Sequence, residues 1–195
     1  MSLPSRLLGA NPSIQVSTLL SGSLTTPSAK GAFYDPPSFD SIASSAGGST
    51  SITFSSIPQT YNHLQVRVMC KTTSAGDLEF RFNGDSGNNY TRHYFGSEGA
   101  SSFSGGSISA NIGYVGYNPS NVYFQLAILD ILDYKSTNKY KTVRSFVGID
   151  ANGSGYVYQT GCMWLSTSAI NQIVFTNNGN TYNSNSSFAL YGIGS

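Results

Sequence analysis

The stretch from Arg81 to Gly96, RFNGDSGNNYTRHYFG, brings together residue types that can do acid–base chemistry. It contains Asp85, Arg92 and His93, one of the two histidines of the chain. A serine triad also needs an exposed nucleophilic serine beside the histidine and the acid. The sequence contains no G-x-S-x-G elbow that would present such a serine. We therefore interpret residues 83–88 as a hairpin loop between two β-strands and not as part of an active site.

Other residue patterns that support catalysis or metal binding are also missing. Asp130 and Asp133 are three residues apart, so on an extended strand they point to opposite faces and cannot flank one glycosidic bond. Asp85 in NGDSG lacks the alternating acids and the terminal glutamate of a calcium loop. Cys70 and Cys162 do not have the paired spacing of zinc ligands. We expect no catalytic residue, no metal site and no cofactor.

The thirteen tyrosines are the remaining residue type that could form a binding site. A tyrosine offers a large apolar ring and a hydroxyl group with few rotatable bonds, which suits sugar stacking and protein interfaces. The candidate surface, receptor or interface contacts lie near the expected loop end, and they are Tyr90, His93, Tyr94, Tyr114 and Tyr117. The alternative for each tyrosine is that it fills a sheet face or a contact between subunits.

Charged side chains are scarce in this sequence. Only 10% of the 195 residues are Asp, Glu, Lys or Arg, against roughly 25% in an average soluble domain. The formal net charge of +1 is too small for a surface that binds nucleic-acid phosphates, so nucleic acid is excluded as a partner.

No stretch approaches the roughly 20 apolar residues of a membrane span, and no apolar run marks a secretory signal. We expect a soluble protein made without a leader in a reducing cytoplasm. Two buried free thiols then fit better than a disulfide, although pairing of Cys70 with Cys162 stays open.

Residues 1–38 differ in composition from the rest of the chain. They hold five of the seven prolines, many serines and threonines, and only short apolar pairs. Such a segment buries too little apolar surface to offset the entropy lost on ordering. We interpret it as an extended N-terminal attachment arm that gains order from neighbouring chains, with candidate anchors at Leu7, Leu8, Leu19 and Leu20.

From residue 39 to residue 195 the apolar residues recur with a period of two, which is typical of β-strands. The clearest strand is His63–Lys71, with Leu64, Val66, Val68 and Cys70 on one face. The run Val122–Tyr134 changes phase near Asp130, which indicates a β-bulge. Asn152-Gly153 and Asn178-Gly179 are the residue pairs favoured in tight turns. Eight to ten strands and no helix predict an all-β, two-sheet jelly-roll-like β-sandwich.

Several blocks of the sequence resemble small structural, tail-associated virion proteins of tailed bacteriophages. The blocks cover most of the chain after about residue 39, and they are ITFSSIPQTYNHLQVRV (52–68), RFNGDSGNNYTRHY (81–94), DILDYKSTNKYKTVRSFVGIDANGSG (130–155) and SFALYGI (187–193). The resemblance implies a virion location and brings no catalytic residue with it.

Three functions follow as hypotheses. The first is a non-enzymatic tail fibre or tail-tip component, a homotrimer whose arm binds other virion proteins and whose β-sandwich meets the host surface, with a host-surface glycan as candidate ligand. The second is a capsid decoration protein that reinforces the shell. The third, a glycan-degrading enzyme, is disfavoured because the sequence offers no opposed pair of carboxylates.

Overall fold

The computed structural model describes residues 39–118 and 121–194. The chain divides into two units, Met1–Pro37 and Ser38–Ser195, and all the described residues belong to the second unit. The expected arm of residues 1–38 lies outside the described residues, together with its candidate anchors Leu7, Leu8, Leu19 and Leu20.

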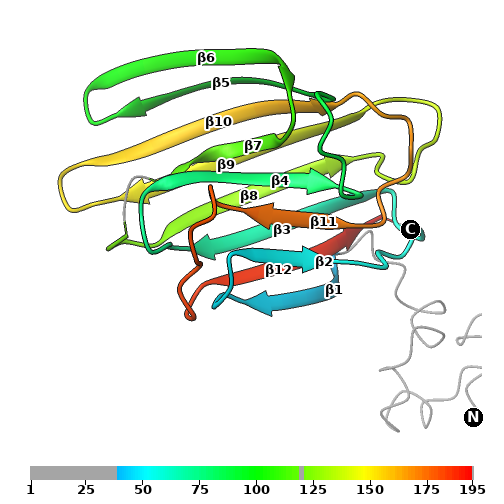
Figure 1. Cartoon of the computed structure of the whole chain (residues 1–195), viewed down its shortest axis with the longest axis horizontal. Helices are drawn as coiled ribbons and strands as arrows, with labels where there is room; N and C mark the ends of the chain where they lie inside the picture. The colour runs from blue at the N-terminus through cyan, green and yellow to red at the C-terminus, as the bar shows by residue number, and fades with distance from the viewer. Residues whose placement is uncertain (1–38, 119–120, 195) are drawn as a thin grey trace, which may run out of the picture. The chain divides into compact units, whose positions relative to one another are not determined.

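The described residues form twelve β-strands and no helix, so the prediction of an all-β fold is confirmed (Figure 1). The strands are β1 (Phe39–Ala46), β2 (Ser51–Phe54), β3 (His63–Cys70), β4 (Gly76–Phe82), β5 (Tyr90–Glu98), β6 (Ser101–Ala110), β7 (Gly113–Asn118), β8 (Gln125–Leu132), β9 (Lys141–Asp150), β10 (Gly155–Trp164), β11 (Ile173–Thr176) and β12 (Ser187–Ile193).

The strands form two antiparallel sheets. The larger has the order β1-β12-β3-β8-β9-β10-β5-β6, and the smaller has the order β2-β11-β4-β7. From β2 onward the chain passes repeatedly from one sheet to the other, with β8, β9 and β10 as the one run of three consecutive strands that stays in the same sheet. The neighbours β1-β12-β3-β8 of the larger sheet and the strands β2-β11-β4-β7 of the smaller sheet give the eight strands in two sheets of a jelly roll. The predicted jelly-roll-like sandwich is therefore confirmed.

The apolar alternation along the strands places one face of each sheet in the core. In β3 the side chains of Leu64, Val66, Val68 and Cys70 are buried while the residues between them are not, as the sequence predicts. They pack against aromatic side chains of the smaller sheet, such as Phe80 on β4. Burial of these rings and branched side chains supplies the main stabilisation of the domain.

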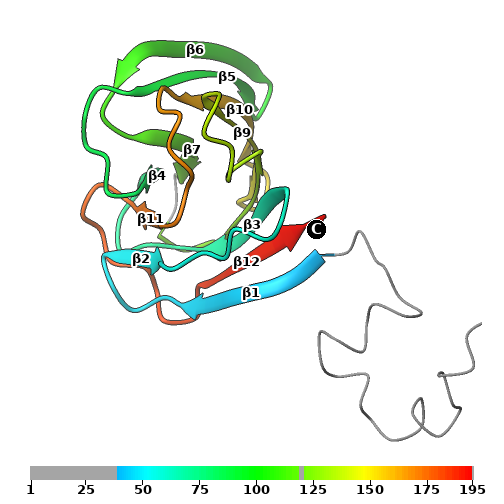
Figure 2. The ribbon, with the colours of Figure 1, turned by 90° about the vertical axis from the view of Figure 1, so that its right-hand side faces the viewer.

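The larger sheet is strongly curved. Figure 2 shows it bending from β5 and β6 through β10 and β9 to β3, β12 and β1, around the smaller sheet. The edge strand β7 of the smaller sheet contacts the concave side of this curve. There the carbonyl oxygen of Val115 accepts hydrogen bonds from Ser145 Oγ (2.9 Å) and Thr160 Oγ1 (3.0 Å). These two bonds join the sheets. Apolar side chains in place of Ser145 and Thr160 would leave the carbonyl of Val115 without these hydrogen bonds.

Two local expectations are wrong. Residues 83–88 do not form a hairpin loop, because β4 and β5 belong to different sheets and the segment crosses between them. The bulge expected near Asp130 is also absent: β8 pairs with β3 and β9 without a register shift, and Asp130 shares its face with Leu126 and Ile128. The apparent change of phase arose because β8 carries apolar side chains on both faces.

The turn at Asn152-Gly153 matches its prediction. Asn152 and Gly153 have φ values of 56° and 98°, and the N–H of Ala151 donates to the carbonyl of Ser154 at 2.7 Å. Two consecutive residues with positive φ are typical of a type I′ hairpin turn, which suits the twist of the strands that it joins. The pair closes the hairpin between β9 and β10.

Candidate functional site

Asp85, the aspartate of the Arg81–Gly96 stretch, fixes the conformation of the loop that crosses from β4 to β5. The Asp85 carboxylate accepts hydrogen bonds from Trp164 Nε1 at 2.7 Å, from the amide of Asn89 at 2.9 Å and from the backbone N–H of Gly87 at 2.9 Å. Partial burial alone would raise the pKa of Asp85, but these three donors outweigh it and lower the pKa. The carboxylate is therefore ionised and fully engaged in fixing the loop, so it is not free to act as a base.

The first of the candidate contacts, Tyr90, lies in the core. Its side chain is fully buried, its hydroxyl accepts a hydrogen bond from the N–H of Phe82 at 3.0 Å, and its ring packs edge-on against Phe80. Burial raises its pKa to about 12. Tyr90 therefore has no surface to offer a receptor, and its role is to connect β5 to β4.

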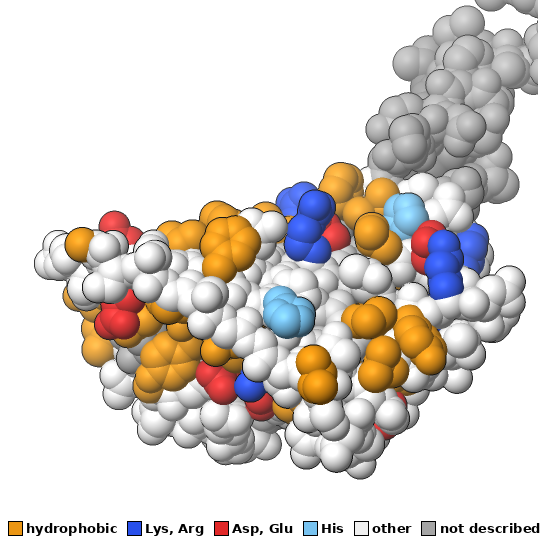
Figure 3. Space-filling view, turned by 90° about the horizontal axis from the view of Figure 1, so that it is seen from above, with side chains coloured by type: hydrophobic (Ala, Val, Ile, Leu, Met, Phe, Trp, Pro, Cys, Tyr) orange, Lys and Arg blue, Asp and Glu red, His pale blue; other side chains and the backbone are white. Residues whose placement is uncertain are grey.

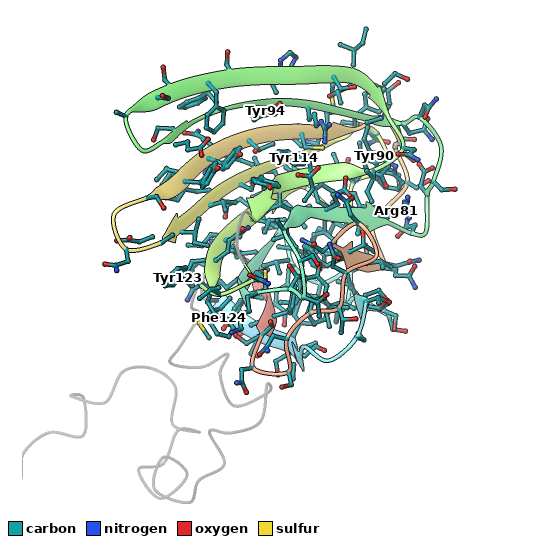
Figure 4. The ribbon with its side chains drawn as sticks, turned by 60° about the vertical axis from the view of Figure 1, so that its left-hand side comes forward. Arg81, Tyr90, Tyr94, Tyr114, Tyr123 and Phe124 are labelled. Carbon is teal, nitrogen blue, oxygen red and sulfur yellow. The ribbon has the colours of Figure 1, made fainter. Side chains whose placement is uncertain are left out.

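Of the other candidates, Tyr94 and His93 lie on opposite faces of β5 in the larger sheet. Tyr114 and Tyr117 lie on β7 of the smaller sheet. Tyr94 on β5 points inward and packs against Tyr114 on β7, with ring centroids 5.4 Å apart (Figure 4). Tyr114 is only 6% exposed, whereas Tyr117 is half-buried against Tyr156. His93 lies on the opposite face of β5 and is exposed. The structure thus brings Tyr94 and Tyr114 together on the inner side of the larger sheet and places His93 apart from these tyrosines, on the outer surface.

A group of charged side chains that the sequence did not single out lies beside this tyrosine pair. The guanidinium of Arg92 sits over the ring of Tyr114, 4.6 Å from its centroid. Burial raises the pKa of Asp77, and burial together with the charge of Asp77 raises the pKa of Glu79 to about 7, with Arg92 opposing both shifts. Asp77 and Glu79 are two residues apart on β4, so they lie side by side on one wall. They are not opposed across a cleft as glycoside hydrolysis requires.

The remaining acids and histidine considered in the sequence make structural contacts. His63 Nδ1 accepts the backbone N–H of Asp133 at 3.0 Å. Asp133 is ion-paired with Lys139, which lowers its pKa. Asp130 lies on the outer face of the larger sheet, apart from this turn, and is paired there with Arg144 at 3.0 Å.

Cys70 and Cys162 are both free thiols and both buried. Burial raises the pKa of Cys70 to about 12, and burial, partly offset by a backbone hydrogen bond and by Arg92, raises that of Cys162 to about 11. Each thiol is therefore protonated near neutral pH and behaves as a small apolar side chain. Within residues 39–118 and 121–194, no three His, Cys, Asp or Glu side chains form a group that could hold a metal ion.

The outer face of the larger sheet carries a row of exposed hydrophobic side chains, which we call the apolar patch. Its members come from adjacent strands, are between 40% and 60% exposed, and are Met69, Leu126, Ile128, Phe146 and Val157. Four of them line a hollow of about 600 Å³ above Gly148. Figure 3, which looks onto the molecule from above, shows separate orange hydrophobic groups on a mostly white surface, with blue and red side chains beside some of them.

A second hollow, of about 700 Å³, lies on the same face above Gly161. By strand register Gly161 sits between Arg144 on β9 and His93 on β5. Phe95, 59% exposed, and Gln159 also line this hollow. Arg144 donates a hydrogen bond to the carboxylate of Asp130. Asp130 accepts a second hydrogen bond, at 2.9 Å, from the side-chain amide of Gln65.

Sequence reasoning named His93 but missed its neighbours above Gly161. The signal was present in the alternation of β10, where Val157, Gln159 and Gly161 fall on the face opposite the buried Tyr158 and Thr160. A glycine on the outer face of a central strand leaves an open space on that face, because it has no side chain. Which residues surround the gap depends on the pairing of β10 with β9 and β5, and no single strand shows that pairing.

No family model, no curated protein and no solved structure matches this chain. No helix among the described residues is long and apolar enough to cross a membrane.

Proposed function

We propose that this chain is a non-enzymatic structural protein of a tailed-bacteriophage virion, where it forms part of a tail fibre or tail tip. In this proposal residues 1–38 attach it to other virion proteins, and the β-sandwich of residues 39–195 meets the host surface. The resemblance of the sequence blocks to tail-associated virion proteins motivates the location. The apolar patch is the structural observation that carries the role in assembly.

The apolar patch supports assembly because of its position and its surroundings. Leu126, Ile128 and Phe146 are adjacent across β8 and β9 and leave a large part of their apolar surface in contact with water. A contiguous exposed patch of this kind marks an interaction surface. In a chain with only 10% charged residues, few charges are present to keep copies apart. We take the occupant to be another copy of the chain, arranged as a homotrimer about a closed symmetry axis.

The geometry of the acids favours a non-enzymatic role. Asp85 is held by three donors, Asp133 is paired with Lys139, and Asp77 and Glu79 lie on one strand. None of these pairs has two carboxylates facing each other across an open hollow, and the hollow above Gly161 is lined by no carboxylate.

The proposal is tested on purified particles of the phage that carries the gene. Gold-labelled antibodies raised against the full chain should mark the tail or its tip, and the band of the chain should correspond to a few dozen copies at most. Labelling spread over the capsid, with hundreds of copies, would instead identify a decoration protein. Absence of the chain from particles would remove the virion role altogether.

A further inference from the structure

The hollow above Gly161 has the dimensions and the rigidity of a ligand site. A Cβ added to Gly161 would meet no heavy atom within 4 Å, so the space above this residue is empty. The volume of about 700 Å³ falls in the range of small-molecule sites. Its lining comes from β5, β6, β9 and β10, which are hydrogen-bonded to one another, and sites on paired strands hold their geometry better than sites on loops.

The lining combines one flat apolar ring with several hydrogen-bonding groups. Phe95 exposes more than half of its side chain at the edge of the hollow. Around it lie the hydroxyl groups of Thr142 and Ser104, the amide of Gln159 and the imidazole of His93. The hydroxyl and amide groups can both donate and accept hydrogen bonds. The complementary ligand has an apolar ring face and a rim of groups that also donate and accept.

The charge in the hollow is compensated. Arg144 is the only lining side chain that always carries a charge, and it is paired at 3.0 Å with Asp130. Its planar guanidinium has five N–H donors, so donors remain for a ligand after the two groups have paired. Because Asp130 offsets the positive charge, the hollow does not favour a phosphate or carboxylate over a neutral hydroxyl-bearing ligand.

We propose that the hollow above Gly161 binds a neutral hexopyranose unit of a polysaccharide. The C–H face of the sugar ring packs on Phe95, and its hydroxyl groups bond to Gln159, Thr142 and Arg144. The inference rests on the proposed function for the source of the sugar, which is then the host surface. It makes the part of the larger sheet around β5, β6 and β10, beside the apolar patch and not the tyrosines of the loop end, the surface that the host meets.

The test uses the full chain, labelled with ¹⁵N, and follows backbone amide signals by NMR. D-glucose, D-galactose and N-acetyl-D-glucosamine are added separately at millimolar concentrations, with inorganic phosphate as the charged comparison. We expect at least one sugar to shift the amide signals of Gly161, His93 and Ser104 in a saturable manner, and phosphate to shift them less. If none of the three sugars moves these signals, or if phosphate binds more tightly than every sugar, the proposal is wrong.

Two leucine variants separate the hollow from general effects on the fold. Gly161→Leu places a side chain in the empty space, where its Cβ meets no heavy atom within 4 Å, and should weaken sugar binding roughly tenfold, the loss expected when one or two hydrogen bonds to the ligand are blocked. Thr53→Leu places the same side chain on the exposed face of β2 in the other sheet and should bind sugar as the wild type does. Equal sugar affinity in Gly161→Leu and wild type contradicts the assignment of the site.

The outcome is distinguishable from failure of the proposed function. If the chain is found on virion tails but no sugar binds, the structural role stands and the glycan site is wrong. If sugars bind above Gly161 but the chain is absent from particles, the site stands and its assignment to a virion is wrong.

Discussion

Trp164 donates its indole N–H to Oδ2 of Asp85 at 2.7 Å, and this bond joins the last residue of β10 to the crossover loop that precedes β5. The two residues are 79 positions apart in the chain. Trp164 is only 3% exposed, so its donor has little access to water if the acid is removed. The aspartate that first suggests chemistry is therefore a fixed part of the sandwich.

Replacement of Asp85 should destabilise the fold. Asp85→Ala leaves the indole N–H of Trp164 and the amide of Asn89 without their acceptor, and we expect a loss of about 1–3 kcal/mol in the free energy of unfolding. Urea unfolding followed by circular dichroism measures this loss. Asp150→Ala is the matched control, because the exposed Asp150 accepts one local bond from the N–H of Asn152, and it should lose less than about 1 kcal/mol. Equal losses in the two variants would contradict the role of Asp85.

The stability contribution of Asp85 should also depend on pH. Its pKa is lowered in the folded protein, so the ionised carboxylate adds stability that is present above the pKa of the unfolded chain, near 3.8. This contribution is lost as the pH falls through the lower pKa of the folded state. The difference in unfolding free energy between the wild type and Asp85→Ala should therefore be constant from pH 7 to pH 5 and shrink below pH 4. A difference that grows on acidification would reverse the sign of the argument.

Glu79 should have the opposite pH dependence. Its pKa is raised from 4.5 to about 7 by burial and by Asp77, so the folded state binds a proton that the unfolded state has released between these pH values. Stability due to this group therefore falls as the pH rises from 4.5 to about 7. Glu79→Gln should unfold at a higher urea concentration than the wild type at pH 8 and at a similar one at pH 4. If Glu79→Gln is less stable than the wild type at pH 8, the ionised carboxylate of Glu79 stabilises the fold through its attraction to Arg92, and the expected sign is wrong.

Phe146 should control self-association if the apolar patch binds other copies. Phe146→Ser removes a ring that is 56% exposed, so we expect little change in the unfolding midpoint but a lower molar mass in solution. Light scattering coupled to gel filtration measures the mass over a range of protein concentrations. Ile108→Ser, at an 81% exposed position on β6 outside the patch, is the control and should keep the wild-type mass. A monomeric wild type at every concentration would exclude the trimer.

The thiols should be unreactive until the protein unfolds. Cys70 and Cys162 are buried with raised pKa values, so at pH 8 the folded chain should react slowly with Ellman's reagent. In concentrated urea both thiols should react, giving two equivalents per chain. Rapid labelling of the folded protein would mean that one of these side chains is accessible, and no labelling in urea would indicate a disulfide.

Deletion of residues 1–38 tests whether these residues attach the protein to the virion while the sandwich folds without them. The described strands begin at Phe39, so we expect the shortened chain to stay folded, with a β-type circular dichroism spectrum and a cooperative thermal transition. We also expect it to be missing from purified virions when it replaces the full chain. Its presence on particles at the normal level would show that attachment lies in the sandwich.

The sequence predicted those parts of the fold whose signals are local. The alternation of Leu64, Val66 and Val68 and the turn at Asn152-Gly153 depend on neighbouring residues, and the structure bears both out. The strand β6, SSFSGGSISA, is not predicted from the sequence because seven of its ten residues are serine or glycine and it lies at the edge of the larger sheet. An edge strand with little buried surface has no apolar alternation to detect.

The candidate site was harder to predict because it depends on pairing between distant strands. Tyr90 could be a surface contact or fill a sheet face by its sequence alone, and the crossover between the sheets turns its ring into the core. The burial of Glu79 likewise depends on tertiary packing around β4, which leaves no mark in the alternation of the strand itself.

The empty space above Gly148 and Gly161 has a consequence for how such a surface can diversify. Neither glycine has a positive φ, and a Cβ added at either one would meet no heavy atom within 4 Å, so a small side chain can be placed there without disturbing the pairing of β9 with β10. A single codon change at either position would reshape what the outer face can contact. New recognition properties are therefore within one mutational step of the existing sequence, at little cost to the stability of the scaffold.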